Sequence, residues 1–122
     1  MDEKEFEKYM VEAIDNIPEP YSSKLNNVTF RIEKEPSQQQ RKSLGLRKCD
    51  ALFGLYEGVP LTKRGGAIHS IVPDVITLFM HPMTEIFQDV ESLRKQIYKT
   101  LWHEVAHYYG LDHDRIHQIE KP

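Results

Sequence analysis

The longest periodic segment of this 122-residue chain lies near its C-terminus, and it constrains the fold more than any other feature. Between residues 86 and 108, apolar residues recur every three or four positions, which predicts one long amphipathic helix. Asp89 is its expected N-cap, although a turn from Thr84 can precede it, and Gly110 is its expected stop. The apolar positions of this helix are Ile86, Val90, Leu93, Ile97, Leu101, Val105 and Tyr108.

The end of this helix carries two histidines, His103 and His107, and Glu104 follows the first of them. Residues four apart lie on one helix face, so the two imidazoles can hold one ion at about 2.0–2.1 Å. Both histidines fall on the flank of the apolar stripe, and Gln96 and Thr100 continue that polar flank. The helix can therefore bury one face and offer its flank to a cleft, where Glu104 can reach a metal-bound water.

The motif continues through Gly110 to His113, which completes the longer pattern H-E-x-x-H-x-x-G-x-x-H. A glycine can turn the chain back at the helix end, so that His113 becomes the third ligand beside His103 and His107. Three imidazoles would leave one position for water, which is the arrangement of a catalytic Zn²⁺ site. Asp112 or Asp114 is the alternative third ligand. The remaining histidines are expected at the surface or behind the ligands; they are His69, His81 and His117.

The rest of the chain predicts an α+β fold with three strands. Residues 3–16 have helical periodicity and end before Pro18 and Pro20, and residues 27–33 alternate as a half-buried strand. Residues 34–48 are polar and indicate a loop. Residues 50–57 and 75–80 are the other strand candidates, and the latter is apolar on both faces, so we expect it to be largely covered.

Composition excludes several classes of protein. The chain is 39% apolar and 29% charged, which is typical of a single globular domain over residues 1–122 rather than a disordered chain. Its net charge of −3 does not suggest a nucleic-acid binder. No apolar run is long enough to cross a membrane, and the acidic N-terminal segment is unlike a signal peptide. Cys49 is the only cysteine, which favours a cytoplasmic location.

The segment from Thr100 to Ile116 resembles the active-site region of the small bacterial zincin-like metallopeptidases. Residues 52–61 and 73–79 extend the similarity to nearly the whole chain. The resemblance implies a minimal zincin-like fold, in which an N-terminal helix and a C-terminal zinc-binding helix back a short mixed sheet of three to four strands. It also implies a zinc-dependent peptidase, with a peptide or protein as substrate. The position of His113 is often Asp in that family.

No methionine follows His113, so the sequence lacks the Met-turn of the metzincins, and we expect a shallow cleft. The expected reaction is peptide hydrolysis by a metal-activated water with Glu104 as general base. Tyr108, Tyr109 and Arg115 are the candidate donors to the oxyanion. By analogy with zincin-like relatives, substrate would lie along an edge strand, for which residues 75–80 are the candidate.

Two other functions compete with the peptidase. Gly110 to His113 is similar to the end of the metal-binding motif in bacterial endoribonucleases of ribosomal RNA maturation, which typically lack a glutamate in the place of Glu104. Glu104 and the acidic net charge therefore favour the peptidase. The domain can alternatively be a zinc-binding interaction module without catalysis, in which Lys63 and Arg64 would belong to a partner-binding loop.

Overall fold

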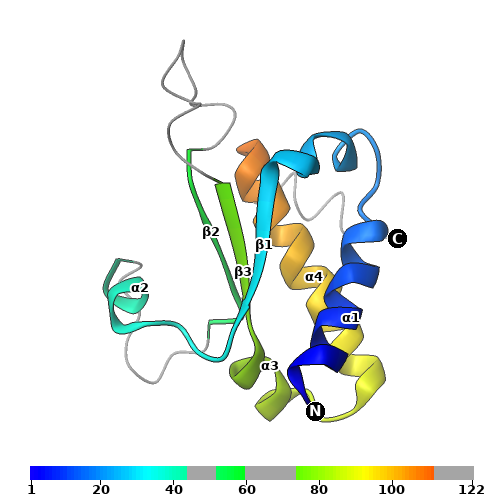
Figure 1. Ribbon diagram of the computed structural model, residues 1–122, viewed down its shortest axis with the longest axis vertical. Helices are drawn as coiled ribbons and strands as arrows, with labels where there is room; N and C mark the ends of the chain where they lie inside the picture. The colour runs from blue at the N-terminus through cyan, green and yellow to red at the C-terminus, as the bar shows by residue number, and fades with distance from the viewer. Residues whose placement is uncertain (44–51, 60–73, 112–122) are drawn as a thin grey trace.

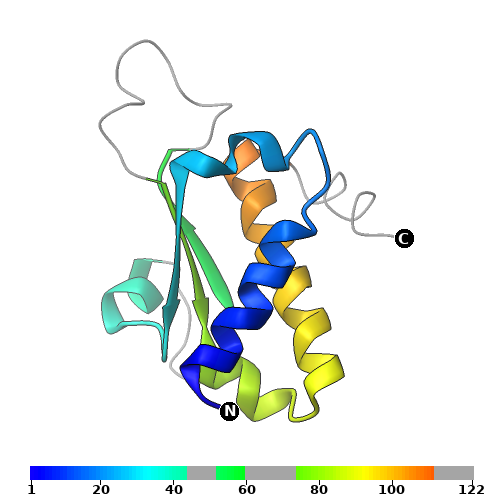
Figure 2. The same ribbon diagram turned by 45° about the vertical axis from the view of Figure 1, so that its right-hand side comes forward.

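The described part of the chain forms three strands and a set of helices in the order α1, η1, β1, α2, β2, β3, α3, α4 (Figure 1). The computed structural model describes residues 1–43, 52–59 and 74–111. The two long helices, α1 (Glu3–Asp15) and α4 (Val90–Tyr109), lie side by side on one face of the sheet, and the short helix α2 (Gln38–Ser43) lies on the opposite face (Figures 1 and 2). This arrangement confirms the predicted α+β class with a mixed sheet.

The sheet is built from β1 (Val28–Glu33), β2 (Gly54–Glu57) and β3 (Asp74–Phe79), in the spatial order β1-β3-β2. β3 pairs parallel to β1 and antiparallel to β2. The prediction of residues 75–80 as an edge strand is therefore wrong, because β3 is central and hydrogen bonded on both sides. Its apolar character on both faces is the signature of that central position.

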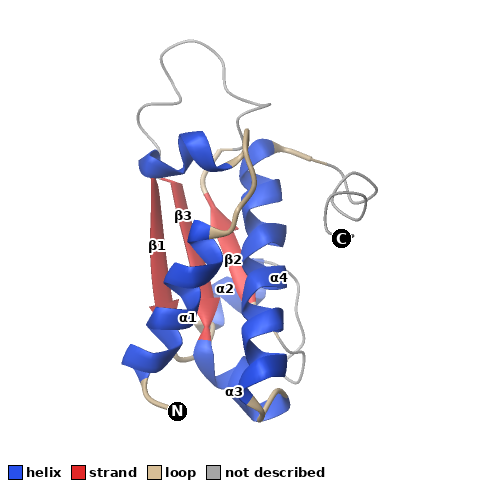
Figure 3. Ribbon diagram, turned by 90° about the vertical axis from the view of Figure 1, so that its right-hand side faces the viewer, coloured by secondary structure: helices blue, strands red, loops and turns tan. Residues whose placement is uncertain are grey.

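The hydrophobic core lies between the sheet and the pair of long helices (Figure 3). Helix α1 places Phe6, Met10 and Ala13 against α4, as its helical periodicity predicts. At the rim of this contact Glu12 accepts a hydrogen bond from Arg94 over 2.9 Å, a surface ion pair that adds little stability. The largest fully buried side chains include Trp102, Phe6, Phe79, Ile76, Leu78, Met83, Leu93, Ile97, Leu101 and Val105.

Both ends of α4 are capped as expected. The Asp89 side chain accepts a hydrogen bond from the Ser92 backbone N–H over 2.9 Å, which also lowers the pKa of that carboxyl group. At the other end Gly110 adopts φ 76°, a left-handed conformation that suits glycine. The backbone N–H groups of Gly110 and Leu111 donate to the carbonyls of His107 and Ala106, respectively, at 3.0 Å in both cases. These bonds form a Schellman motif that ends the helix.

Three short helices are not anticipated by the strand and loop assignments above. Helix α2 falls inside the expected polar loop, and it begins with a reciprocal cap in which Ser37 and Gln40 exchange backbone-to-side-chain hydrogen bonds of 2.8 and 3.0 Å. The 3₁₀ helix η1 (Ser22–Asn27) precedes β1. Helix α3 (Met80–Ile86) follows β3 directly, so helical structure begins four residues before the turn expected from Thr84.

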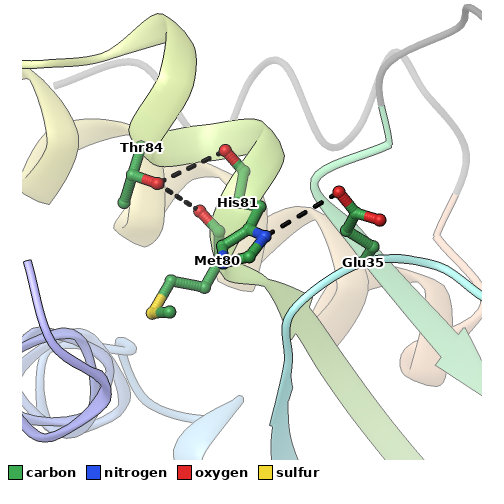
Figure 4. Close-up of polar contacts among 4 residues, drawn as sticks. All are labelled: Glu35, Met80, His81 and Thr84. Carbon is green, nitrogen blue, oxygen red and sulfur yellow. Dashed lines mark hydrogen bonds and ion pairs between the residues drawn. The ribbon is translucent and has the colours of Figure 1, made fainter.

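Helix α3 is held by local polar contacts (Figure 4). The Thr84 hydroxyl donates to the backbone carbonyl of Met80 over 3.0 Å and to that of His81 over 3.3 Å. His81 Nδ1 lies 3.7 Å from Glu35 Oε1 at the surface. Within the described residues, no helix is long and apolar enough to cross a membrane.

Candidate metal centre

The last turns of α4 bring His103, Glu104 and His107 together. One potential ligand atom from each of them lies within 4.8 Å of the other two. The two imidazole rings are one helical turn apart, with their centroids separated by 4.7 Å and their planes tilted by 60°. The grouping is a direct product of the helix, because residues at i and i+4 share one face. Among the described residues, His103, Glu104 and His107 form the one group of histidines and carboxylates close enough together to hold a metal ion.

Glu104 is a partly buried carboxyl group in this cluster. Burial raises the pKa of its carboxyl group to about 7, because removal from water disfavours the charged form. A hydrogen bond from the backbone of Tyr56 in β2 favours the charged form and offsets part of that shift. In the metal-free protein the pKa of this carboxyl group is thus close to neutral pH, the range that suits a general base.

The hydrogen bond to Glu104 comes from the outer edge of β2. Hydrogen-bonded pairs alternate along an antiparallel ladder, and the Phe79 N–H donates to the Phe53 carbonyl over 2.8 Å. In the observed register, Leu55 and Glu57 therefore bond to β3, whereas the backbone groups of Gly54 and Tyr56 face outward. The cluster on α4 consequently lies beside the edge of this strand that does not pair with β3.

Gly54 explains why α4 and β2 come so close. A Cβ atom at this position would lie 2.7 Å from Thr100 Cγ2, a contact that side chains essentially never make. β2 and α4 run in the same direction (Figure 1). Two strand residues span about 6.6 Å and four helix residues about 6 Å, so contact of Gly54 with Thr100 brings Tyr56 level with Glu104.

Tyr56 is fixed at two further points. Its hydroxyl donates to Asp74 Oδ1 over 2.7 Å, and Asp74 is buried at the start of β3. Its ring packs edge-on against Tyr108, with the ring centroids 5.9 Å apart. Tyr108 follows His107 on α4. The Tyr56 side chain therefore contacts both β3 and the helix that carries the cluster.

The structure brings together three of the residues that the sequence predicts for the site, namely His103, Glu104 and His107. His113, Asp112, Asp114 and Arg115 lie outside the described residues, as do His69, His117, Cys49, Lys63 and Arg64. His81 is on α3, at the far end of the molecule from the end of α4 (Figures 1 and 4).

Of the candidate oxyanion donors, Tyr109 uses its hydroxyl to donate to the backbone carbonyl of Tyr21. It is thereby engaged with the segment that follows α1. Tyr108 is buried and packs against Tyr56. The sequence reasoning missed the contributions of Tyr56 and Gly54, although a glycine inside a strand is a known sign of close backbone approach.

The residues of the cluster fit a divalent transition metal such as zinc. Imidazole nitrogens and carboxylate oxygens are zinc ligands, and both histidines are partly accessible. An ion about 2.1 Å from two nitrogens can hold them no more than about 4.2 Å apart. The potential ligand atoms of the three residues lie within 4.8 Å of one another, which is close to that limit.

The comparison with known families agrees with this geometry. A family model described as zincin-like metallopeptidase matches residues 25–121, which include both β2 and the whole of α4. No curated protein matches the chain significantly.

Proposed function

Because the chain belongs to the zincin-like metallopeptidase family, we propose that it is a zinc-dependent peptidase with its active site at the end of α4. The observation that carries this proposal is the juxtaposition of His103 and His107 with a partly buried glutamate, Glu104. A single domain over residues 1–122, a peptide or protein substrate and a cytoplasmic location belong to the same proposal.

His103 and His107 would hold the ion, with His113 as the proposed third ligand and Asp112 or Asp114 as its alternatives. Zinc held by these residues would supply Lewis-acid chemistry, activating the attacking water and polarising the scissile carbonyl. Glu104 accepts a proton from the attacking water and delivers it to the leaving amine.

The substrate would bind along β2 rather than β3. β3 is paired on both sides, whereas the described residues contain no strand on the outer edge of β2. An extended peptide can add to a free edge through main-chain hydrogen bonds. Because the Tyr56 backbone on this edge contacts Glu104, a peptide bound there would pass beside the proposed general base.

Substitution of Glu104 by Gln tests the proposal. Glu104→Gln keeps the size of the side chain and both histidines, so the variant should bind one zinc ion per chain like the wild type. Hydrolysis of a peptide library should fall at least about 100-fold, since general base catalysis contributes roughly that much. Zinc content is measured by elemental analysis and cleavage by mass spectrometry.

Three other results would contradict the proposal. Unchanged turnover in Glu104→Gln would remove Glu104 as the base, and wild-type protein without bound metal would remove the site. A zinc-loaded wild type that cleaves no peptide would instead support a zinc-binding interaction module. Parallel incubation with structured RNA separates the peptidase from the endoribonuclease.

A further inference from the structure

The side chains on the face of β2 opposite α4 would contact the side chains of a peptide bound along this strand. Side chains alternate along a strand, so Leu55 and Glu57 share this face, while Gly54 and Tyr56 point toward α4. A peptide added to the outer edge would place alternate side chains directly beside Leu55 and Glu57. Such cross-strand neighbours lie about 5 Å apart at their Cβ atoms and interact directly.

Glu57 presents a negative charge at this edge. Its side chain is exposed, and Oε1 accepts a hydrogen bond from Gln40 Nε2 in α2 over 3.3 Å. The amide orients the carboxylate without neutralising it. None of the ion pairs among the described residues involves Glu57. The carboxylate therefore remains available to a cation from outside the chain.

Space is available beside this carboxylate. A cavity of about 460 Å³ lies between β2 and the start of α2, with Glu57, Leu55, Gln39 and Gln40 among its lining residues. Among the described residues that line this cavity, Arg31 of β1 is the one of opposite charge.

The distances decide which of the two charges a bound peptide would meet. Adjacent strands are about 4.8 Å apart, so a peptide on the outer edge of β2 would lie about 5 Å from that strand but about 14 Å from β1. The peptide residue opposite Glu57 would be the direct cross-strand neighbour of this carboxylate, whereas Arg31 belongs to β1, two strands away from β2. The edge therefore selects a basic residue.

We infer that β2 selects peptides with a lysine or arginine beside Glu57 and an apolar residue, two positions away, beside Leu55. The inference rests on the proposed function and adds to it a class of substrate. The residue between these two would face α4 and lie level with Tyr56 and Glu104. An opposite-charge pair across two strands favours such peptides by about two- to fivefold over neutral ones.

The test measures peptide binding separately from cleavage. Fluorescent peptides that differ only by Lys, Gln or Glu at each position in turn are titrated into zinc-loaded Glu104→Gln protein, with anisotropy as readout. This protein should bind the Lys peptide about two- to fivefold tighter than the Gln peptide at one position. Adding Glu57→Gln should abolish that preference, and adding Glu57→Lys should reverse it in favour of Glu.

Glu91→Gln is the matched control, because Glu91 is an equally exposed acidic residue in the first turn of α4, far from β2. It should leave the preference unchanged. Identical profiles with and without Glu57→Lys would overturn the inference while the peptidase stands, and so would the absence of any peptide binding. Selective binding by a protein that never cleaves would retain the inference and overturn catalysis.

Discussion

At the scale of single residues, Glu104 is a carboxyl group largely shielded from water, and it lies one residue from a proposed metal ligand. The Tyr56 backbone supplies a hydrogen bond that favours its charged form, but burial outweighs this bond and keeps the pKa near 7. The unfolded chain has a pKa of about 4.3 at this position, so the folded metal-free protein binds the proton more tightly. Protonation of Glu104 at lower pH therefore stabilises the folded state.

This linkage predicts a pH dependence of stability in metal-free protein. Because the folded-state pKa is the higher one, the contribution of Glu104 is complete below about pH 4 and is lost as the pH rises to about 7 and beyond. The loss can reach about 3 kcal/mol. Urea unfolding in the presence of a chelator, repeated between pH 5 and 8, measures it.

Glu104→Gln serves as the reference for this measurement, since glutamine does not titrate. The free energy of unfolding of the wild type should fall relative to that of the variant as the pH rises. A difference that stays constant across this range would show that Glu104 is not buried in the metal-free protein.

At the scale of elements, the site depends on how closely α4 approaches β2. Thr100 is buried against Gly54, and its hydroxyl accepts a hydrogen bond from Gln96 Nε2 over 2.9 Å. The polar flank that the sequence predicts on α4 is therefore the surface that faces the edge strand. Displacement of the helix here would separate Glu104 from the Tyr56 backbone one turn later.

Gly54→Ala should accordingly destabilise the fold by about 1–3 kcal/mol, which is the usual cost of overpacking. It should also lower hydrolysis, because Glu104 loses its position beside β2. Thr100→Ser removes the methyl group that the new Cβ would meet and keeps the hydroxyl. The double variant should thus recover much of the stability and activity, as measured by urea unfolding and peptide cleavage.

Thr100→Ser alone is the control and should have a small effect. The two substitutions should be coupled by at least about 0.5 kcal/mol. Additive effects would mean that the methyl group of Thr100 does not set the spacing between the two elements.

The elements differ in how far the sequence alone predicts them. Both ends of α4 follow from local signals, namely Asp89, Gly110 and the apolar repeat, so the helix and its two histidines are predictable. The polar composition of residues 34–48 indicates a loop, whereas the only local sign of helix α2 is the capping box formed by Ser37 and Gln40. The order of the strands depends on contacts between distant segments, and the central position of β3 had only its two apolar faces as a signal.

The same distinction holds within the site. His103, Glu104 and His107 come from consecutive turns of one helix, and their spacing is visible in the sequence. Tyr56 contributes a backbone group, which every residue possesses, and no side-chain motif can report it. Its role emerges only once the register between β2 and β3 places that group on the outer edge.

At the scale of the whole molecule, the proposed metal would stabilise more than its own ligands. Helix α4 packs against α1 on one side and the sheet on the other, so it contributes to the entire core. The unfolded chain has no helix to hold His103 and His107 on one face, and it binds the ion more weakly. Binding energy at the end of α4 therefore becomes folding energy for the protein.

Zinc at 100 times its dissociation constant should raise the free energy of unfolding by about 2.7 kcal/mol. For a domain of this size the melting temperature rises by roughly 10 °C. Differential scanning fluorimetry with and without a chelator measures the shift. Glu104→Gln should retain it and His107→Ala should lose it, whereas equal shifts in wild type and His107→Ala would contradict the ligand assignment.

The pairing of α1 with α4 also has a consequence during synthesis on the ribosome. Glu12 and Arg94, which meet at this contact, are 82 positions apart. At about 5–20 residues per second, the first helix waits roughly 4 to 16 s before its partner has been made. Throughout that interval the apolar face of the nascent helix lacks the native cover that α4 later provides.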